Sequence, residues 1–232
     1  MKVSFDVISD LYLTPEDNFN WEGKSTSLYC IIAGNISNDI KVIHQTLSHL
    51  SQFYQGIFYV AGSLEYANIE EIPSKATEIY RVCSLIRNVA FLHNHVVIVD
   101  GVAILGANGW FGNTEVGGIF TEAKKEEHRY DDISYLGNTL EKLQLHLDVR
   151  KIIVVTNSVP NIELFLGEEP DGIKDQLPPN VALINDTEGK TSHWIYGTYG
   201  KTVDTTINNV NYINNSCFNR KPYWAKTIEV KN

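Results

Sequence analysis

Polar side chains stand directly after short apolar runs of this chain, at the points where strands would end. Asp10 follows one such run, and Asn35 and Asn157 follow two others. Proteins of the α/β class bind ligands in the crevice outside the carboxyl ends of their strands, so a carboxylate and two amides there could contact a bound molecule. The alternatives are that Asp10 accepts hydrogen bonds from nearby backbone amides and that the two asparagines form turns.

Five segments extend this pattern in chain order. They are Val7–Tyr12, Ile31–Asn38, Tyr59–Tyr66, Ile153–Pro160 and His193–Gly200. Together they resemble the calcineurin-like metallophosphoesterase family, which carries D-x-H, G-D-x-x-N/D, G-N-H-E/D, a lone His after a strand, and G-H-x-H. The resemblance runs from about residue 3 to about residue 205. It implies an α/β fold, an αββα sandwich of two mixed sheets flanked by helices, in a single domain over residues 1–232.

Nearly every metal-binding position of the family pattern holds a different residue in this chain. By the resemblance, Asp10 occupies the first ligand position and is retained. The replacements are Tyr12 for the His of D-x-H, Asn35 for the Asp that bridges both metals, Ser63 and Leu64 for the Asn and His of G-N-H, Asn157 for the lone His, and Thr198 and Gly200 for the two His of G-H-x-H. The glycines that frame these positions remain, at Gly34, Gly62 and Gly197.

These replacements remove the groups on which two-metal chemistry depends. A two-metal centre holds dications about 3.5–4 Å apart and needs imidazoles and carboxylates to bind them. Asn, Ser and Thr are neutral and weak ligands, and Leu and Gly side chains cannot ligate. Without metals there is no water of low pKa to act as the nucleophile, and Leu64 cannot act as a general acid. We therefore expect a catalytically inactive protein with no metal and no other cofactor.

Aromatic residues stand at or beside several of the replaced positions. Tyr12 and Tyr199 could stack on a base, because every base presents an aromatic face, or they could fill the volume that the metals occupy in the family. Trp110 lies in a loop that the resemblance places over the site, where we expect an exposed ring that serves recognition. For Trp194 and Tyr196, which lie on a predicted strand, packing within the core is the favoured interpretation.

The histidines do not form a metal cluster in the sequence. His193 could face the pocket but is offset from the family's ligand positions. His93 and His95 could face the same way on a strand, yet no third ligand joins them, so a structural role is favoured. The candidate ligand-binding residues are Asp10, Tyr12, Asn35, Ser63, Trp110, Asn157, His193, Thr198 and Tyr199.

Composition limits the classes of partner. The chain has 232 residues, 43% of them hydrophobic, a net charge of −9 and an isoelectric point near 5.2. This charge argues against non-specific nucleic-acid binding, which depends on Lys and Arg. Cys30, Cys83 and Cys217 are far apart and form no C-x-x-C motif, so buried free thiols are expected. No signal-peptide pattern and no apolar stretch approaching about 18 residues is present, which predicts a cytoplasmic protein without a membrane segment.

The periodicity of apolar residues predicts alternating strands and helices, followed by a β-rich second half. Strands are expected at 2–9, 28–33, 56–61 and 151–156, with two or three more in 89–106, and helices at 39–54, 74–88 and 131–149. Turns are expected at Asp100-Gly101, Asn208-Asn209 and Asn214-Asn215. The helical stripes place Leu85 and Leu147 inward.

Nearly all the metal ligands are lost, but the strands and glycines that surround them are retained. This combination favours a protein that binds a nucleotide-like or phosphorylated small molecule in the former active-site cleft without cleaving it. The chain is rich in Asn and poor in Ala, which indicates an AT-rich genome such as those of some phages, so a phage sponge for a host nucleotide signal is one form of this hypothesis. Asp10 would repel a phosphate. Binding therefore needs backbone amides, a cation such as Lys24, Arg129 or Lys201, or a ligand held mainly by its base and ribose.

Two alternatives remain at this point. The first is a pseudoenzyme that acts as a protein-interaction or inhibitor module. Its net negative charge would attract a basic partner such as a host protein. The second is weak metal-dependent phosphodiesterase activity through an unusual site. The sequence alone names neither the ligand nor the partner.

Overall fold

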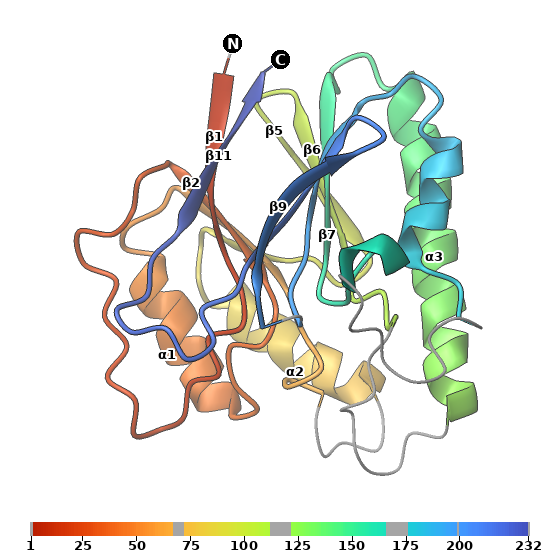
Figure 1. The fold of residues 1–232 in the computed structure, drawn as a ribbon. Coiled ribbons are helices and arrows are strands. Elements are labelled where there is room, and N and C mark those ends of the chain that lie inside the picture. The colour runs from red at the N-terminus through yellow and green to blue at the C-terminus, as the bar shows by residue number, and fades with distance from the viewer. Residues whose placement is uncertain (1, 67–71, 112–121, 166–175, 199, 232) are drawn as a thin grey trace.

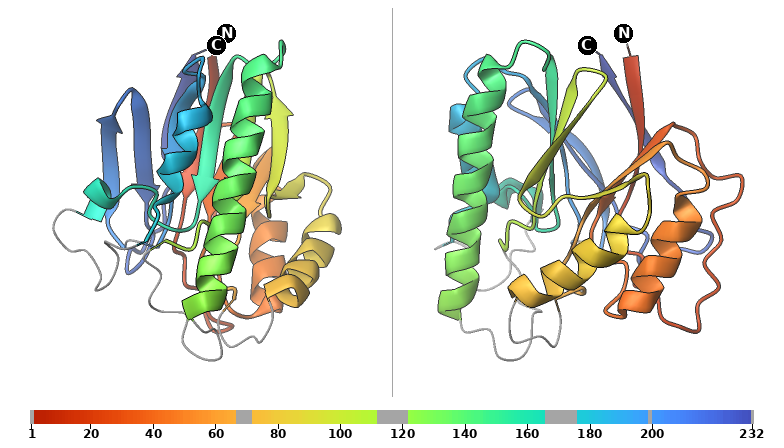
Figure 2. Two further views of the ribbon diagram at one scale, coloured as in Figure 1. Left: turned by 90° about the vertical axis from the view of Figure 1, so that its right-hand side faces the viewer. Right: turned by 180° about the vertical axis from the view of Figure 1, so that it is seen from behind.

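The computed structural model describes residues 2–66, 72–111, 122–165, 176–198 and 200–231. Its architecture is two mixed β-sheets packed face to face, with helices on both outer faces (Figures 1 and 2). This confirms the αββα sandwich expected from the sequence. In the parts of the chain that are described, no helix combines the length and apolar character needed to traverse a bilayer.

The first sheet has the strand order β11-β1-β2-β3-β4. Its strands are β1 (Lys2–Ile8), β2 (Tyr29–Ala33), β3 (Gly56–Val60), β4 (Val89–Phe91) and β11 (Lys226–Lys231). They run parallel except for β11, which pairs antiparallel with β1. Two helices, α1 (Ile40–Leu50) and α2 (Ile72–Ser84), cover the outer face of this sheet (Figure 1).

The second sheet has the order β5-β6-β7-β8-β10-β9. Its strands are β5 (His95–Val99), β6 (Val102–Ala107), β7 (Lys151–Thr156), β8 (Thr191–Ile195), β9 (Thr202–Ile207) and β10 (Val210–Asn215). The central strands are parallel, and β5 and β9 close the two edges antiparallel. The long helix α3 (Glu122–Leu145) and the short helices η1 (Ile162–Phe165) and η3 (Pro179–Asn185) lie on its outer side (Figure 2).

Apolar side chains from both sheets form a shared layer between them. Phe5 and Ile31 contribute from the first sheet, and Ile104, Ile153 and Ile195 contribute from the second, all fully buried. Strands covered on both faces are apolar almost without interruption, which explains why the central runs were recognisable in the sequence. This packing sets the two sheets so that the ends of their strands meet at one edge.

Local sequence signals account for several element boundaries. Asp39 caps α1 by accepting a hydrogen bond from the Lys41 backbone N–H at 2.7 Å, which satisfies a donor that the helix leaves unpaired. The hairpin expected at Asp100-Gly101 is confirmed, with φ angles of 50° and 78° at its two turn residues. The three cysteines are free and buried, as expected.

Three expectations about elements are wrong. Leu85 and Leu147 are not inward but 76% and 96% exposed, because α2 ends at Ser84 and α3 ends at Leu145, before the helical stripe reaches them. The dipeptide Asn214-Asn215 is not a turn but the end of β10. Its side chains are used inside the protein, as when Asn215 Nδ2 donates to the backbone carbonyl of Val7 at 2.9 Å, so the turn preference of Asn gives way to tertiary hydrogen bonds.

Candidate functional site

The carboxyl ends of the parallel strands bring together one group of polar side chains. Asp10 and Asn35 follow β1 and β2, Ser63 follows β3, Asn157 follows β7 and Thr198 follows β8. We call these five residues the polar floor. All belong to the set expected from the sequence, and the structure joins them in one hydrogen-bonded cluster.

Asp10 is fully buried, and donors surround its carboxylate. Its Oδ1 accepts hydrogen bonds from Asn35 Nδ2 and from the Thr198 backbone N–H, both at 2.9 Å. Its Oδ2 accepts from Ser9 Oγ at 3.1 Å, and the Ser216 side chain adds another hydrogen bond. Burial raises the pKa of Asp10, and these hydrogen bonds offset part of that rise. The carboxylate thus serves as an acceptor for groups of the protein itself.

Asn35 is fixed at both ends of its amide. Its Oδ1 accepts from the Leu64 backbone N–H at 3.0 Å and lies 3.4 Å from Ser63 Oγ. Its Nδ2 is thereby turned toward Asp10, to which it donates. An Asp in this position would offer two oxygens to a cation, whereas the amide presents N–H groups to the carboxylate.

Asn157 ties the second sheet to the first in the same manner. Its Oδ1 accepts from the Ser63 backbone N–H at 3.0 Å and from Thr198 Oγ1 at 2.6 Å. Its Nδ2 donates to the carbonyl of Ala33 at 3.1 Å. The polar floor is therefore a closed network that crosses the interface between the sheets.

Unusual backbone conformations accompany this network. Asp10, Asn35 and Thr198 all have left-handed φ angles, of 56°, 61° and 65°. Such angles are uncommon outside Gly, and they are least favourable for a β-branched residue such as Thr198. Gly34 has φ 81°, and a Cβ placed there would lie 2.9 Å from Gly62 Cα, so a side chain cannot be added without moving a neighbouring loop.

Glu65 is a second buried carboxylate that the sequence analysis did not single out. It accepts backbone N–H groups of Asn35 at 3.0 Å, Ile36 at 2.5 Å and Gly62 at 2.7 Å, and the hydroxyl of Tyr59 at 2.9 Å. Burial raises its pKa, and these donors counter the rise. Glu65 holds the loops after β2 and β3 together. The sequence does offer one sign of this role, because Glu65 is the acidic residue of the segment Tyr59–Tyr66.

Tyr12 lies at the rim of the polar floor rather than within it. It is half-buried, has φ 49°, and meets the ring of Phe218 edge-on with centroids 5.0 Å apart. Both rings border a shallow cavity of about 160 Å³. Tyr199, the other tyrosine expected at the site, lies outside the described residues.

Trp110 is not exposed, contrary to expectation. Its ring is 3% exposed, packs against Tyr66 at 5.5 Å, and lies in the core of the first sheet, while Phe111 is equally buried. The loop after β6 therefore turns its aromatic residues inward. The core placement expected for Trp194 and Tyr196 is confirmed, since both are fully buried.

The remaining expected groups lie apart from the polar floor. His193 is in the middle of β8, with its Nδ1 2.9 Å from Ser192 Oγ, and burial lowers its pKa. Lys24 lies over the ring of Trp21 at 5.6 Å. Arg129 lies on α3, is buried, and donates to Gln176 Oε1 at 2.9 Å.

The donor set of the polar floor does not fit a two-metal centre. Asp10 is its one carboxylate, and both of that carboxylate's oxygens already accept hydrogen bonds from the protein. The polar floor contains no imidazole. The amide N–H of Asn35 is directed at Asp10 Oδ1, an oxygen that a metal ion would need as a ligand. Among the described residues, no group of three or more His, Cys, Asp and Glu is arranged to hold a metal ion.

Solved structures with a similar fold support the architecture. The crystal structure of phosphopantetheinyl hydrolase from Mycobacterium tuberculosis aligns with 98% of this chain and 96% of its own, with a TM-score of 0.68 and 15% identity. A putative 5′-nucleotidase from Staphylococcus aureus aligns with 92% of this chain but 48% of its own, with a TM-score of 0.54 and 12% identity. The fold is thus that of metallophosphoesterase-like proteins.

Sequence comparison adds one relative. The uncharacterized protein L509 of Acanthamoeba polyphaga mimivirus is 25% identical over 124 residues, which is 47% of this chain and 44% of that protein. The match therefore spans less than half of the relative's length. No protein-family model matches the chain.

Proposed function

We propose that this protein is a metallophosphoesterase-like pseudoenzyme. It does not hydrolyse phosphoesters, and it binds and sequesters a nucleotide-like or phosphorylated small molecule at the former active-site cleft. The observation that carries the proposal is the closed polar floor, in which Asn35 and Thr198 donate to the carboxylate of Asp10 where the family places a metal. A hydrolase of this type needs that carboxylate free to ligate.

The rim of the polar floor supports the binding half of the proposal. Tyr12 and the partly exposed Phe218 offer aromatic surface beside the floor. The same shallow cavity is lined by Arg220, Lys221 and Asp17, and Lys221 Nζ pairs with Asp17 Oδ1 at 2.6 Å. Arg220 is therefore the cation that can offset the repulsion between a phosphate and the carboxylates near the site. Within a host cytoplasm such retention would act as a sponge for a nucleotide signal.

The absence of catalysis is tested by metal content and turnover. Purified protein, dialysed and analysed for elements, should contain well under one transition metal per chain. With added Mn²⁺, bis-p-nitrophenyl phosphate should be hydrolysed no faster by the protein than by buffer, and Asp10→Asn should not alter the rate. Near two equivalents of Mn, Fe or Zn, or a metal-dependent rate that Asp10→Asn removes, would overturn the proposal.

Ligand binding is tested separately with a panel of mono-, di- and cyclic nucleotides. A ligand at 100 times its dissociation constant adds about 2.7 kcal/mol to the free energy of unfolding, which gives a clear thermal shift. Tyr12→Ala should abolish the shift, whereas Tyr130→Ala, an exposed tyrosine on α3, should preserve it. A panel without any stabilising nucleotide contradicts the binding half and leaves the catalytic half standing.

A protein-interaction module is the second candidate, and one observation favours it. Leu145, Leu147 and Ile184 are each more than four-fifths exposed, at the end of α3 and on η3, which pack together. Exposed apolar residues that gather on one side often mark contacts with other proteins. Co-purification of one stoichiometric host protein, lost in Leu147→Asp, would favour this candidate if no nucleotide binds.

A further inference from the structure

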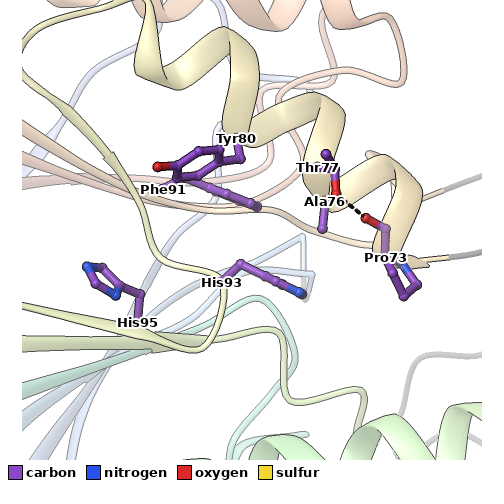
Figure 3. A pocket seen from close by; sticks show the side chains of 7 residues that line it. All are labelled: Pro73, Ala76, Thr77, Tyr80, Phe91, His93 and His95. Carbon is purple, nitrogen blue, oxygen red and sulfur yellow. Dashed lines mark hydrogen bonds between the residues drawn. The ribbon is translucent and has the colours of Figure 1, made fainter.

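A second opening lies between α2 and the turn from β4 to β5, and we call it the α2 cleft (Figure 3). Its volume is about 490 Å³, within the range of roughly 300–1,000 Å³ that small-molecule sites occupy. It is lined by Pro73, Ala76, Thr77, Tyr80, Phe91, His93 and His95. None of these residues belongs to the polar floor or its rim.

One face of α2 forms a wall of the cleft. Pro73, Ala76, Thr77 and Tyr80 follow the i, i+3, i+4, i+7 spacing that brings side chains onto one helical face. Thr77 Oγ1 donates to the carbonyl of Pro73 at 2.8 Å, so the threonine hydroxyl is already used by the helix. Tyr80 is 64% exposed, which leaves most of its ring open to a ligand.

Aromatic rings lie on both sides of the cleft. In Figure 3, His93 and His95 lie across the opening from the α2 residues, with Phe91 on the side of Tyr80. Phe91 and His93 stack directly on each other, with ring centroids 5.7 Å apart and planes inclined by 5°, so no guest fits between these two rings. The ring faces that the cleft exposes favour a flat guest, because stacking needs no specific donor pattern.

The polar groups of the cleft are free to recognise such a guest. Within the described residues, the imidazole of His95 and the hydroxyl of Tyr80 have no hydrogen-bond partner, while His93 Nδ1 lies 3.4 Å from Tyr66 Oη. Partial burial and the nearby His128 lower the pKa of His93. A neutral imidazole both donates and accepts hydrogen bonds. Among the described residues, the lining contains no carboxylate, Lys or Arg that would select a charged ligand.

From this geometry we propose that the α2 cleft is a binding site for an uncharged planar heterocycle of one or two fused rings. The ring lies in the opening between Tyr80 on α2 and the two histidines across from it, and His95 hydrogen-bonds its edge. This site is separate from the rim at Tyr12 and does not depend on the function proposed above.

The experiment is calorimetric titration of the whole chain with adenosine, guanosine and uridine as probes. At least one nucleoside should bind with a dissociation constant below about 1 mM. Tyr80→Ala should weaken it at least about fivefold, the lower end of the effect of losing one stacking partner. Thr77→Trp, at an exposed position, should block the cleft and abolish binding. Tyr130→Ala, on the exposed side of α3, should leave the affinity unchanged.

Two results would overturn the proposal. One is that no nucleoside binds in this range. The other is that a nucleoside binds with unchanged affinity to both Tyr80→Ala and Thr77→Trp. If binding is instead lost in Tyr12→Ala alone, the ligand occupies the rim, the α2 cleft is not its site, and the proposed function gains support. Metal content and phosphodiester turnover do not involve the cleft, so failure here is distinguishable from failure of the pseudoenzyme proposal.

Discussion

The polar floor and the α2 cleft use polar side chains in opposite ways. In the floor, every polar side-chain atom of Asp10, Asn35 and Asn157 already has a hydrogen-bond partner within the protein. In the cleft, His95 and Tyr80 stand at the surface of a cavity without partners among the described residues. A polar residue at the end of a strand is thus no guide to binding until its hydrogen bonds are counted.

Under the proposed function, hydrogen bonds take the place that metal coordination has at the strand ends of a two-metal centre. Here amides and hydroxyls draw the same strand ends together by hydrogen bonds, across the interface between the two sheets. The floor then contributes stability, whereas the cleft contributes little stability and remains available for binding. The following predictions test this contrast, beginning with the largest effect.

Removing the acceptor that holds the floor's loops should be the most damaging change. Glu65→Ala leaves three buried backbone N–H groups and the Tyr59 hydroxyl without their acceptor. We expect it to lower the free energy of unfolding by about 3–5 kcal/mol, measured by urea denaturation. Glu141→Ala, an exposed position on α3, should change it by less than about 0.5 kcal/mol. Equal effects of the two substitutions would refute a structural role for Glu65.

The pH dependence of stability should report the titration of Asp132, a buried carboxylate outside both regions. It accepts from the Gly109 backbone N–H at 2.8 Å and from the side chain of Asn94, which lies between the two cleft histidines. Burial raises the pKa of Asp132 from 3.8 to about 6. Between these values the folded state retains a proton that the unfolded state has lost, so stability falls as pH rises from about 4 to about 6.

The magnitude follows from the size of this shift. A difference of about two pKa units corresponds to about 3 kcal/mol at most. Asp132→Asn should remove this part of the slope in the free energy of unfolding, measured by urea denaturation at several pH values. Burial also raises the pKa of Asp10 and of Glu65, so a slope of the same sign should persist in the variant. A slope identical to that of the unmodified protein would contradict the prediction.

Cutting the bridge between the sheets should have a smaller effect. Asn157→Ala removes the acceptor of Thr198 Oγ1 and of the Ser63 backbone N–H, and the donor to Ala33. Some of these groups can turn to water at the partly exposed Thr198, so we expect a loss of about 1–3 kcal/mol in unfolding free energy. Differential scanning calorimetry would measure it. Stabilisation by this substitution would mean that the network is strained rather than supportive.

The cleft should behave in the opposite way. His95→Ala and Tyr80→Ala remove exposed side chains that make no described hydrogen bond, so the unfolding free energy should change by less than about 0.5 kcal/mol. Both variants should nevertheless lose affinity for the nucleoside probes. A large loss of stability in either variant would show that the residue stabilises the fold, and it would contradict the contrast between the two regions.

Most of the fold was predictable because its central strands are continuous apolar runs bounded by turn residues. The framing glycines predicted where the strands end, since Gly34 and Gly62 approach each other too closely for side chains. The residues of the polar floor could be predicted from the sequence as a group, but the closed hydrogen-bond network that they form could not. Whether an amide points its oxygen or its nitrogen at Asp10 depends on a backbone N–H from another loop, here that of Leu64.

The errors have physical causes of the same kind. Trp110 lies in a loop, and loops usually expose their aromatic residues, but a neighbouring pocket formed with Tyr66 buries it. The α2 cleft was overlooked because His93 and His95 have no third ligand nearby in the sequence. Its cavity lies between α2 and the segment 91–95 that follows it in the chain, and the sequence pattern does not encode how far apart these consecutive segments pack.

The pairing of β11 with β1 bears on how the chain is made. These strands join Lys2 to Lys231 and Val7 to Lys226, and both ends of the chain lie side by side in Figure 1. During synthesis, the outer edge of β1 stays unpaired until residues 226–231 have left the ribosome. An unpaired edge is a template for association with other chains, and closing so long a loop is entropically costly. A nascent chain that stalls before residue 226 therefore carries an unpaired strand edge that favours association with other chains.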